Sequence, residues 1–128
     1  MLVKMKDICT KIGSGATPKG GNNAYIEEGT ALIRSQNILD FSFSYNGLAY
    51  INDEQASKLN GVTIKEDDVL LNITGDSVAR ACMVDNSVLP ARVNQHVCIV
   101  RGNKSRVLSS FILYFLQMKK PELLMMAS

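Results

Sequence analysis

The sequence of 128 residues lacks the features that mark membrane, secreted and zinc-binding proteins. Its longest apolar run, residues 111–116, is far too short to cross a bilayer, which takes about 20 residues. The first residues hold no extended apolar segment of the signal-peptide type, so we expect a cytoplasmic protein without membrane contact. The cysteines, Cys9, Cys82 and Cys98, lack zinc-site spacing and are flanked by apolar residues. We expect reduced, buried thiols and no metal site.

Nucleotide-binding and catalytic motifs are missing as well. Residues 13–15 read Gly-Ser-Gly, without the Lys-Ser/Thr of a P-loop or the full glycine spacing of a dinucleotide site. His96 is the only histidine, and a single histidine does not define a catalytic triad without geometry. We therefore expect no catalytic residue. A small hydrolase that uses Asp76, Ser77 and His96 is the third alternative among the functions considered.

Charge is small in total but uneven along the chain. The formal net charge is +2, too little to indicate a nucleic-acid-binding protein by itself. Residues 1–21 and 69–106 carry an excess of Lys and Arg, whereas residues 51–68 carry an excess of Asp and Glu. This pattern predicts one basic and one acidic face, although charges that only solvate the surface would look the same.

Length and hydrophobic patterning predict one domain over residues 1–128, of the α+β class. Short β-type runs dominate, and the βαβ alternation of a doubly wound sheet is missing. A helix over 53–59 would be capped by Asn52 or Asp53 and stopped by residues 60–61. A final helix over 111–118 would be capped by Ser109 or Ser110 and stopped by Pro121. We expect a mixed or antiparallel β-rich body with a few short helices and a C-terminal helix. The expected strands are residues 31–33, 41–45, 48–51, 62–64, 69–74, 81–84 and 97–100, with 69–74 central and 81–84 its antiparallel partner.

Three polar clusters lie against or inside these apolar runs, at residues 33–38, 74–80 and 92–97. Each contains an arginine, and two hold an adjacent Asn and Gln. A buried amide costs free energy unless its donors and acceptors are bonded, so an Asn-Gln pair gains little in a core strand. Arg suits bidentate reading of guanine, and Asn or Gln suits adenine. We infer DNA as the partner, while a solvated β-turn at 74–80 and an amide network bracing the loops around 94–96 remain alternatives.

The glycine-rich segment 13–23 is dense in turn-forming residues. A plain turn explains it, but its backbone N–H groups with Thr17 and Lys19 could also hold a phosphate. In protein–DNA complexes, side chains that contact the DNA backbone position the protein, whereas side chains that contact base edges read the sequence. We assign Thr17, Lys19, Thr74, Arg92 and His96 to the DNA backbone and Arg34, Gln36, Asn37, Ser77, Arg80, Asn94 and Gln95 to base edges, and we count Ser35 among the DNA-binding residues.

The C-terminal residues 111–126 are apolar on nearly every side. Such a tail either docks on the body of the domain or continues into a segment beyond residue 128. This tail suggests the second functional alternative, a protein-interaction module that docks a partner through this helix. The polar clusters would then form the rim of the interface.

Four segments, residues 7–18, 32–38, 67–77 and 91–97, resemble in order and spacing the target recognition domain of type I restriction–modification specificity subunits. The resemblance implies an α+β domain with a double-β-helix-like body that reads one half of a bipartite DNA target. It further implies a non-catalytic subunit without cofactors of its own. S-adenosylmethionine would serve a separate adenine methyltransferase (modification) subunit, and ATP and Mg would serve a restriction subunit that translocates and cleaves DNA.

The chain departs from this family pattern in its length. It holds one recognition domain, and it stops where the spacer helix of the family would follow. We expect a fragment or a truncated half-subunit that lacks the spacer helix and the second recognition domain.

Overall fold

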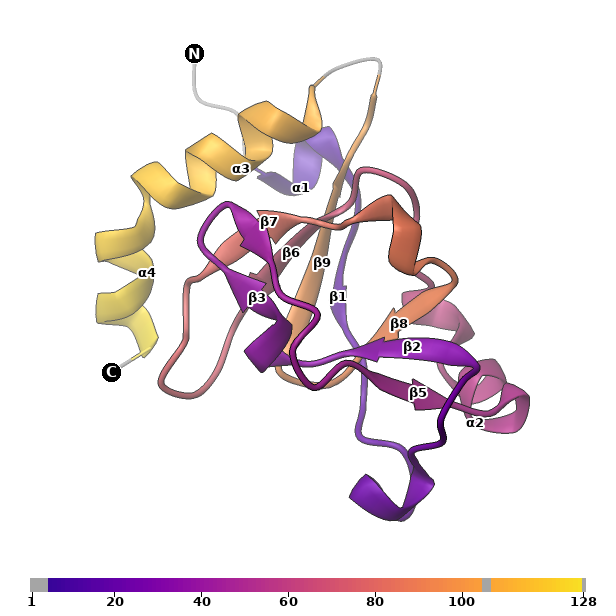
Figure 1. The fold of residues 1–128 in the computed structure, drawn as a ribbon. Helices are drawn as coiled ribbons and strands as arrows, with labels where there is room; N and C mark the ends of the chain where they lie inside the picture. Colours follow the sequence, from indigo (N-terminus) through magenta and orange to yellow (C-terminus); the bar gives the residue numbers. More distant parts are fainter. Residues whose placement is uncertain (1–4, 105–106, 128) are drawn as a thin grey trace.

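The computed structural model describes residues 5–104 and 107–127 and has the expected α+β class (Figure 1). Short strands make up most of the body, and the two longest helices lie at the C-terminal end. With η denoting a 3₁₀ helix, the elements are α1 Met5–Ile8, β1 Cys9–Ser14, η1 Gly21–Ala24, β2 Thr30–Ile33, η2 Ser35–Asn37, β3 Ile38–Leu39, β4 Ser42–Phe43, β5 Ala49–Ile51, α2 Asp53–Lys58, η3 Asn60–Val62, β6 Val69–Asn72, β7 Ala81–Met83, η4 Asn86–Val88, β8 Ala91–Val93, β9 Val97–Gly102, α3 Ser109–Met118 and α4 Lys120–Ala127.

The larger sheet has the strand order β1-β9-β6-β7, and all its neighbouring strands are antiparallel. Successive side chains of a strand point to opposite faces, so each inner strand serves two hydrophobic layers. On β6, Val69 packs beneath α3 while Leu70 enters the core on the other face. On β9, Val100 likewise packs beneath α3 while Ile99 enters the core on the other face.

A three-stranded sheet covers the face of the larger sheet that is turned away from α3. Its central strand, β2, pairs with β5 antiparallel and with β8 parallel. Ile33 of β2 and Val93 of β8 are completely buried against Leu70 and Ile99 of the larger sheet. This two-sheet core holds the loops at the strand ends in fixed positions.

Helix α3 covers the other face of the larger sheet with Ile112 and Leu116, which are four residues apart and therefore share one helix face. Its opposite side remains exposed: Phe111, Tyr114 and Met118 are 57%, 65% and 67% accessible. Figure 1 shows α3 and α4 running along one side of the body. No helix in residues 5–104 and 107–127 is long and apolar enough to cross a membrane.

The thiol prediction is confirmed for two of the cysteines. All three are free, Cys82 and Cys98 are buried, and Cys9 is half-buried. Burial raises the pKa of Cys82 to about 12 and also raises the pKa values of Cys98 and Cys9. A raised pKa favours the protonated thiol over the reactive thiolate.

Several element predictions are confirmed. The central strand 69–74 is β6 and its antiparallel neighbour 81–84 is β7. The helix over 53–59 is α2, and the Asn52 side chain accepts a 2.9 Å bond from the backbone N–H of Gln55 as its N-cap. Pro121 lies in the first turn of α4, where a missing N–H is tolerated.

Others are wrong. The expected strand 41–45 is reduced to β4, because Phe41 adopts a left-handed φ of 63° and turns the chain. Residues 60–61 do not stop the helical segment, which continues as η3 through Val62. The expected strand 62–64 is reduced to an isolated bridge between Thr63 and Arg92. The cap of α3 is Leu108, without a side-chain bond, rather than Ser109 or Ser110.

Candidate nucleic-acid interface

Four segments that are distant in sequence meet at one end of the molecule. They are the loop after β1, the turn η2 after β2, the loop 73–80 after β6, and the turn 94–96 between β8 and β9. These segments lie together at the lower side of the view in Figure 1. We call this region the polar end and define it by Thr17, Lys19, Arg34, Ser35, Gln36, Asn72, Thr74, Ser77, Arg80, Gln95 and His96.

The loop 73–80 is closed at its base by β6. Backbone bonds join Asn72 N to Arg80 O at 2.9 Å and Ala79 N to Asn72 O at 2.8 Å. Gly75 and Ala79 take left-handed φ angles of 82° and 73°, which bend the loop back on itself. Ser77 is fixed within the loop because its Oγ accepts a 2.9 Å bond from Asn72 Nδ2.

The turn 94–96 is bonded to its neighbours on both sides. The Thr74 hydroxyl bonds to His96 Nδ1, and the backbone N–H of Ile73 donates to His96 O at 3.0 Å. On the other side, the Thr17 hydroxyl donates to Gln95 Oε1. Three of the sequence-predicted segments are thus joined into one surface.

The loop after β1 approaches this turn closely because of a glycine. Gly15 N donates to Asn94 O at 3.0 Å, and a Cβ at Gly15 would lie only 1.8 Å from Val93 O. A side chain at this position would therefore push Thr17 and Lys19 away from the turn 94–96.

Two of the amides predicted to read bases are buried and bonded within the protein. Asn37 is completely buried: its Oδ1 accepts from Arg34 N at 3.0 Å, and its Nδ2 donates to Ser44 O at 2.9 Å and Asn46 O at 3.2 Å. Asn94 is 8% exposed, and its Oδ1 accepts from His96 N at 3.0 Å. These placements speak against base reading by either residue and match the alternative of an amide network.

Arg34 and Gln36 lie at the surface but are held by the turn at 46–47. Arg34 Nη2 donates to Gly47 O, and its guanidinium lies 5.0 Å from the ring centroid of Tyr25. Gln36 Nε2 donates to Asn46 O at 3.3 Å. Both side chains are therefore pre-oriented, which lowers the entropy lost when they bind a partner.

Arg92 lies apart from the polar end. Its side chain crosses to the region of α2, where Nε donates to Ala56 O at 3.3 Å and Nη2 to Asn60 Oδ1 at 3.1 Å. Burial lowers the pKa of its guanidinium from the usual value. Arg92 braces α2 and η3 against β8, which speaks against the predicted phosphate contact.

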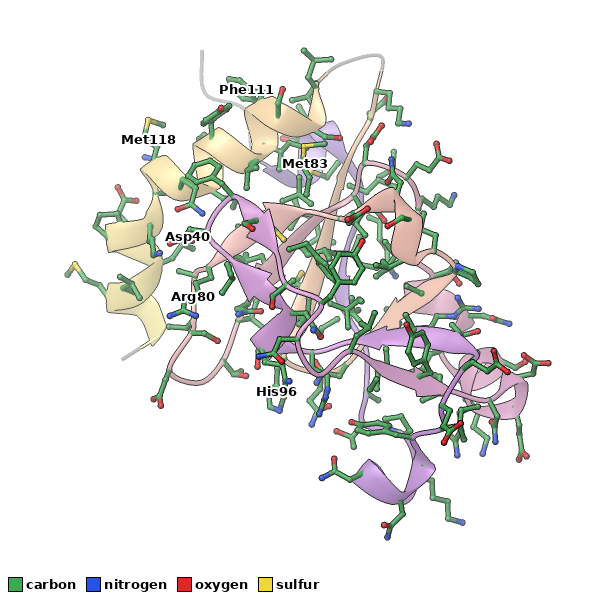
Figure 2. The ribbon with its side chains drawn as sticks, viewed as in Figure 1. Asp40, Arg80, Met83, His96, Phe111 and Met118 are labelled. Atoms are coloured by element: carbon green, nitrogen blue, oxygen red, sulfur yellow. The ribbon has the colours of Figure 1, made fainter. Side chains whose placement is uncertain are left out.

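Arg80 and Lys19 are both exposed. Figure 2 shows Arg80 on the flank of the loop 73–80, on the side toward α4, and His96 at the lower end of the body. The polar end thus carries the cations Lys19, Arg34 and Arg80 beside one carboxylate, Asp76.

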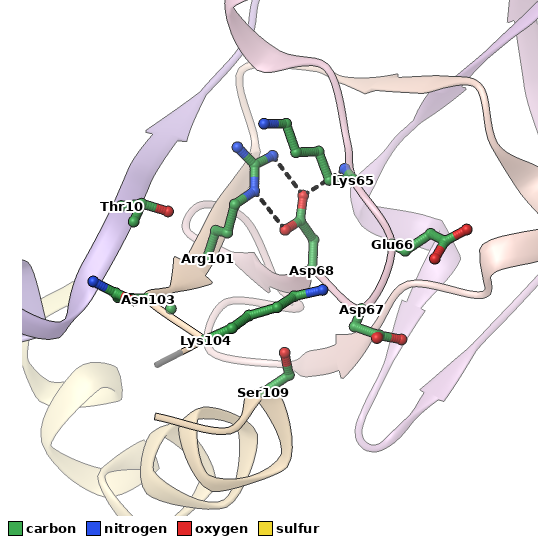
Figure 3. Close-up of a pocket in the computed structure, with 10 residues that line it drawn as sticks. Thr10, Lys65, Glu66, Asp67, Asp68, Arg101, Asn103, Lys104 and Ser109 are labelled. Carbon is green, nitrogen blue, oxygen red and sulfur yellow. Dashed lines mark hydrogen bonds and ion pairs between the residues drawn. The ribbon is translucent and has the colours of Figure 1, made fainter. Parts of the chain in front are cut away.

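Positive charge is not confined to the polar end. Lys65, Arg101 and Lys104 line a pocket of about 440 Å³ near the opposite end of β6, together with Glu66, Asp67 and Asp68 (Figure 3). The expected division into one basic and one acidic face is therefore incomplete. Lys4 and Arg106, which also entered that expectation, lie outside the described residues.

Sequence reasoning missed Asn72 and Tyr25. Asn72 was assigned to an apolar strand, although an amide at the last position of such a strand is itself a signal that needs an explanation. Tyr25 supports Arg34 from a segment without a recognisable pattern, so nothing in the sequence indicated it.

Ser77 and His96, the residues of the hydrolase alternative, bond to other partners at the polar end. Within the described residues, the Ser77 hydroxyl bonds to Asn72, and the His96 ring bonds to the Thr74 hydroxyl. The contact between Ser77 and His96 that nucleophilic catalysis needs is not made there. No cluster of three His, Cys, Asp or Glu in the described parts of the chain could hold a metal ion.

Two solved structures share this fold. The HsdS subunit from Thermoanaerobacter tengcongensis superposes with a TM-score of 0.71 and 18% identity, over 94% of this chain and 28% of that one. A chain from the structural work on complex assembly and conformational transition of the type I R-M system gives a TM-score of 0.69 at 18% identity, with the same coverage. The chain has the fold of part of an HsdS subunit.

This finding confirms, at the level of fold, the resemblance to one target recognition domain of a type I specificity subunit. The chain spans 28% of the length of each of these proteins. No protein-family model matches the sequence. The curated proteins contain no match either.

Proposed function

We propose that the chain is a target recognition domain that reads one half of a bipartite DNA sequence, as a specificity subunit or as part of one. The observation that carries the proposal is the meeting of four separate segments at the polar end, on a two-sheet body with the fold of part of an HsdS subunit. A rigid framework with polar side chains on its loops is the arrangement that sequence-specific recognition requires.

The roles of the side chains follow from their exposure. Gln36, Gln95 and Arg80 are exposed, while Arg34 and Ser77 are half-buried, and we assign these five to base edges. The residues assigned to the DNA backbone are Thr17, Lys19, Ser35, Thr74 and His96. Asn37, Asn94 and Arg92 are left out because their side chains are bonded within the body of the domain.

In this proposal the chain itself catalyses nothing. A modification subunit would transfer the methyl group from S-adenosylmethionine to adenine, and a restriction subunit would use ATP and Mg. The exposed apolar side of α3 supports such an assembly, because Phe111, Tyr114 and Met118 line a continuous surface that water alone would cover unfavourably. We assign this side of α3 to the modification subunit.

The decisive experiment selects binding sequences from a randomised DNA duplex pool, with the full chain and the modification subunit together. The wild-type chain should enrich a short motif, and Gln95→Ala should relax one position of it, at a cost of about 1–3 kcal/mol in discrimination. Gln55→Ala is the matched control, because Gln55 lies on α2, away from the polar end. A motif that is unchanged by Gln95→Ala contradicts the base-reading role, and no motif at all contradicts the function.

The α3 assignment has its own test. Tyr114→Glu should weaken binding of the modification subunit, whereas Ile12→Glu, at a position 49% exposed on β1, should not. Equal binding by both variants would show that the subunit docks elsewhere.

A further inference from the structure

Among the described residues, Asn72 is the side chain whose amide donates to two segments of the polar end at once, the turn η2 and the loop 73–80. It ends β6 opposite Val97 of β9 and is 1% exposed, so it cannot touch DNA itself. Its Nδ2 donates to Ser35 O at 3.0 Å in the turn η2. The same Nδ2 donates to Ser77 Oγ at 2.9 Å and Ser77 O at 3.3 Å in the loop 73–80.

The backbone of Asn72 adds to this control. Its N–H and C=O bond to Arg80 and Ala79, the residues at which the loop 73–80 returns to the sheet. One residue therefore sets both the base of this loop and the distance from Ser77 to Ser35. Gln36 and Arg80, which are assigned to base edges, follow these positions along the chain.

The environment of Asn72 is unfavourable for stability alone. Its Oδ1 is buried and has no hydrogen-bond partner among the described residues. A buried carbonyl without a partner is destabilising, and an apolar side chain at this end of β6 would avoid that cost. What the amide adds at this position is the set of bonds from Nδ2 to the turn η2 and the loop 73–80.

We propose that Asn72 is a positioning residue that holds the turn η2 and the loop 73–80 in register, so that their side chains read neighbouring base pairs together. The inference rests on the proposed function. Bases are discriminated only when donors and acceptors meet their edges in the correct geometry, whereas phosphate contacts tolerate small shifts. Loss of the register therefore lowers sequence discrimination more than it lowers general DNA affinity.

The test uses the full chain with Asn72→Ala, which removes all three side-chain bonds, and Asn72→Ser, which keeps one donor on a shorter arm. Val69→Ala is the matched control, because it perturbs the same strand on the face toward α3. The readouts are the affinity ratio between the selected duplex and a scrambled duplex, the thermal midpoint, and hydrogen exchange in segments 34–37 and 73–80.

For Asn72→Ala we expect an affinity ratio lower by about tenfold, scrambled-duplex affinity within about twofold of wild type, and faster exchange in both segments. The affinity ratio of Asn72→Ser should lie between those of Asn72→Ala and wild type. If Asn72→Ala does not fold, Asn72→Ser is measured in its place. Val69→Ala should lower the thermal midpoint and keep the ratio.

An unchanged ratio in folded Asn72 variants, with the wild type still selecting its duplex, overturns the inference and leaves the proposed function intact. A wild type without any sequence preference overturns the proposed function. In that case faster exchange in only one segment, or in neither, also overturns the coupling of the two loops by Asn72.

Discussion

Among the described residues, the most deeply buried charged side chain lies away from the polar end. Asp68 is 1% exposed and receives Arg101 Nε and Nη2 at 2.7 Å each, a bidentate pair that Figure 3 shows at the wall of the pocket. The backbone N–H of Lys65 donates to the same carboxylate at 2.7 Å. Such a pair is costly to separate, because the remaining charge is left without its partner in a site of low dielectric constant.

Arg101→Leu should therefore lower the free energy of unfolding by about 3–5 kcal/mol, as measured by urea denaturation at neutral pH. Lys58→Ala serves as the control, because its ion pair with Glu54 on α2 is exposed and 3.8 Å long. Removing an exposed pair should cost no more than about 1 kcal/mol. Equal effects of the two substitutions would mean that Asp68 finds other compensation.

Gly15 imposes a steric constraint of a different kind. A Cβ there would overlap the backbone carbonyl of Val93, which cannot move without displacing β8. Gly15→Ala should lower the free energy of unfolding by about 1–3 kcal/mol. Gly61→Ala meets no atom within 4 Å and requires no left-handed φ, so it should be neutral or stabilise the protein by up to about 1 kcal/mol. Thermal unfolding of both variants measures the difference, and similar midpoints would contradict it.

At the scale of elements, α3 and α4 are tied to the β3–β4 hairpin through Asp40. Gln117 Nε2 donates to Asp40 Oδ1 at 2.8 Å, and Lys120 Nζ pairs with Oδ2. Burial alone would favour the neutral carboxyl, but the bonds from Lys120 and Gln117 prevail and hold the pKa of Asp40 below its usual value of 3.8. The charged carboxylate is thus the form that the folded protein stabilises.

The pH dependence follows from this direction. A lowered pKa in the folded state adds stability that is fully present well above pH 3.8 and is lost as the pH falls through the folded-state pKa. Asp40→Asn should therefore reduce the free energy of unfolding at pH 7 by no more than about 1 kcal/mol, since solvent screens this half-exposed pair. The difference from wild type should shrink in denaturation series carried to pH values progressively below 3.8. A difference that persists there would point to lost packing rather than lost charge.

The sequence predicted elements well where the pattern is local. Strands β6, β7 and β9 are apolar runs that end at glycine or polar residues, and α2 has its own cap at Asn52. Strand β8 was missed, because Ala91–Val93 was read as part of a polar cluster. Its parallel pairing with β2 joins residues about 60 positions apart in the chain and has no local signal.

The candidate site, too, was predictable only where the sequence carries a local signal. Residue type indicated which segments meet at the polar end, and loop placement confirmed that they do. Which amides face inward could not be read from the sequence. Asn37 and Gln36 are neighbours of similar chemistry, yet one is completely buried and the other exposed, because the 3₁₀ turn of η2 points them in different directions.

For the molecule as a whole, the two sides offer different chemistry to a partner. The polar end presents amides, hydroxyls and three cations, whereas α3 presents aromatic and methionine side chains. Phosphate binding releases counterions and depends strongly on salt, whereas apolar docking barely responds to it. A salt titration of binding therefore separates the two surfaces.

If Lys19 at the DNA backbone and Arg34 and Arg80 at base edges each displace about one counterion on binding, a plot of log K against log salt for duplex DNA should have a slope of about −3. Arg80→Ala should make the slope shallower by about 1 and leave the preferred sequence recognisable, with one position relaxed. Lys65→Ala should leave the slope unchanged, because Lys65 lies at the pocket beside Asp68, near the opposite end of β6. Fluorescence anisotropy with a labelled duplex across a salt series measures all three slopes. Equal slopes for wild type and Arg80→Ala would mean that DNA meets the protein away from the loop 73–80, since a cation of that loop that binds against the duplex adds to the counterions released.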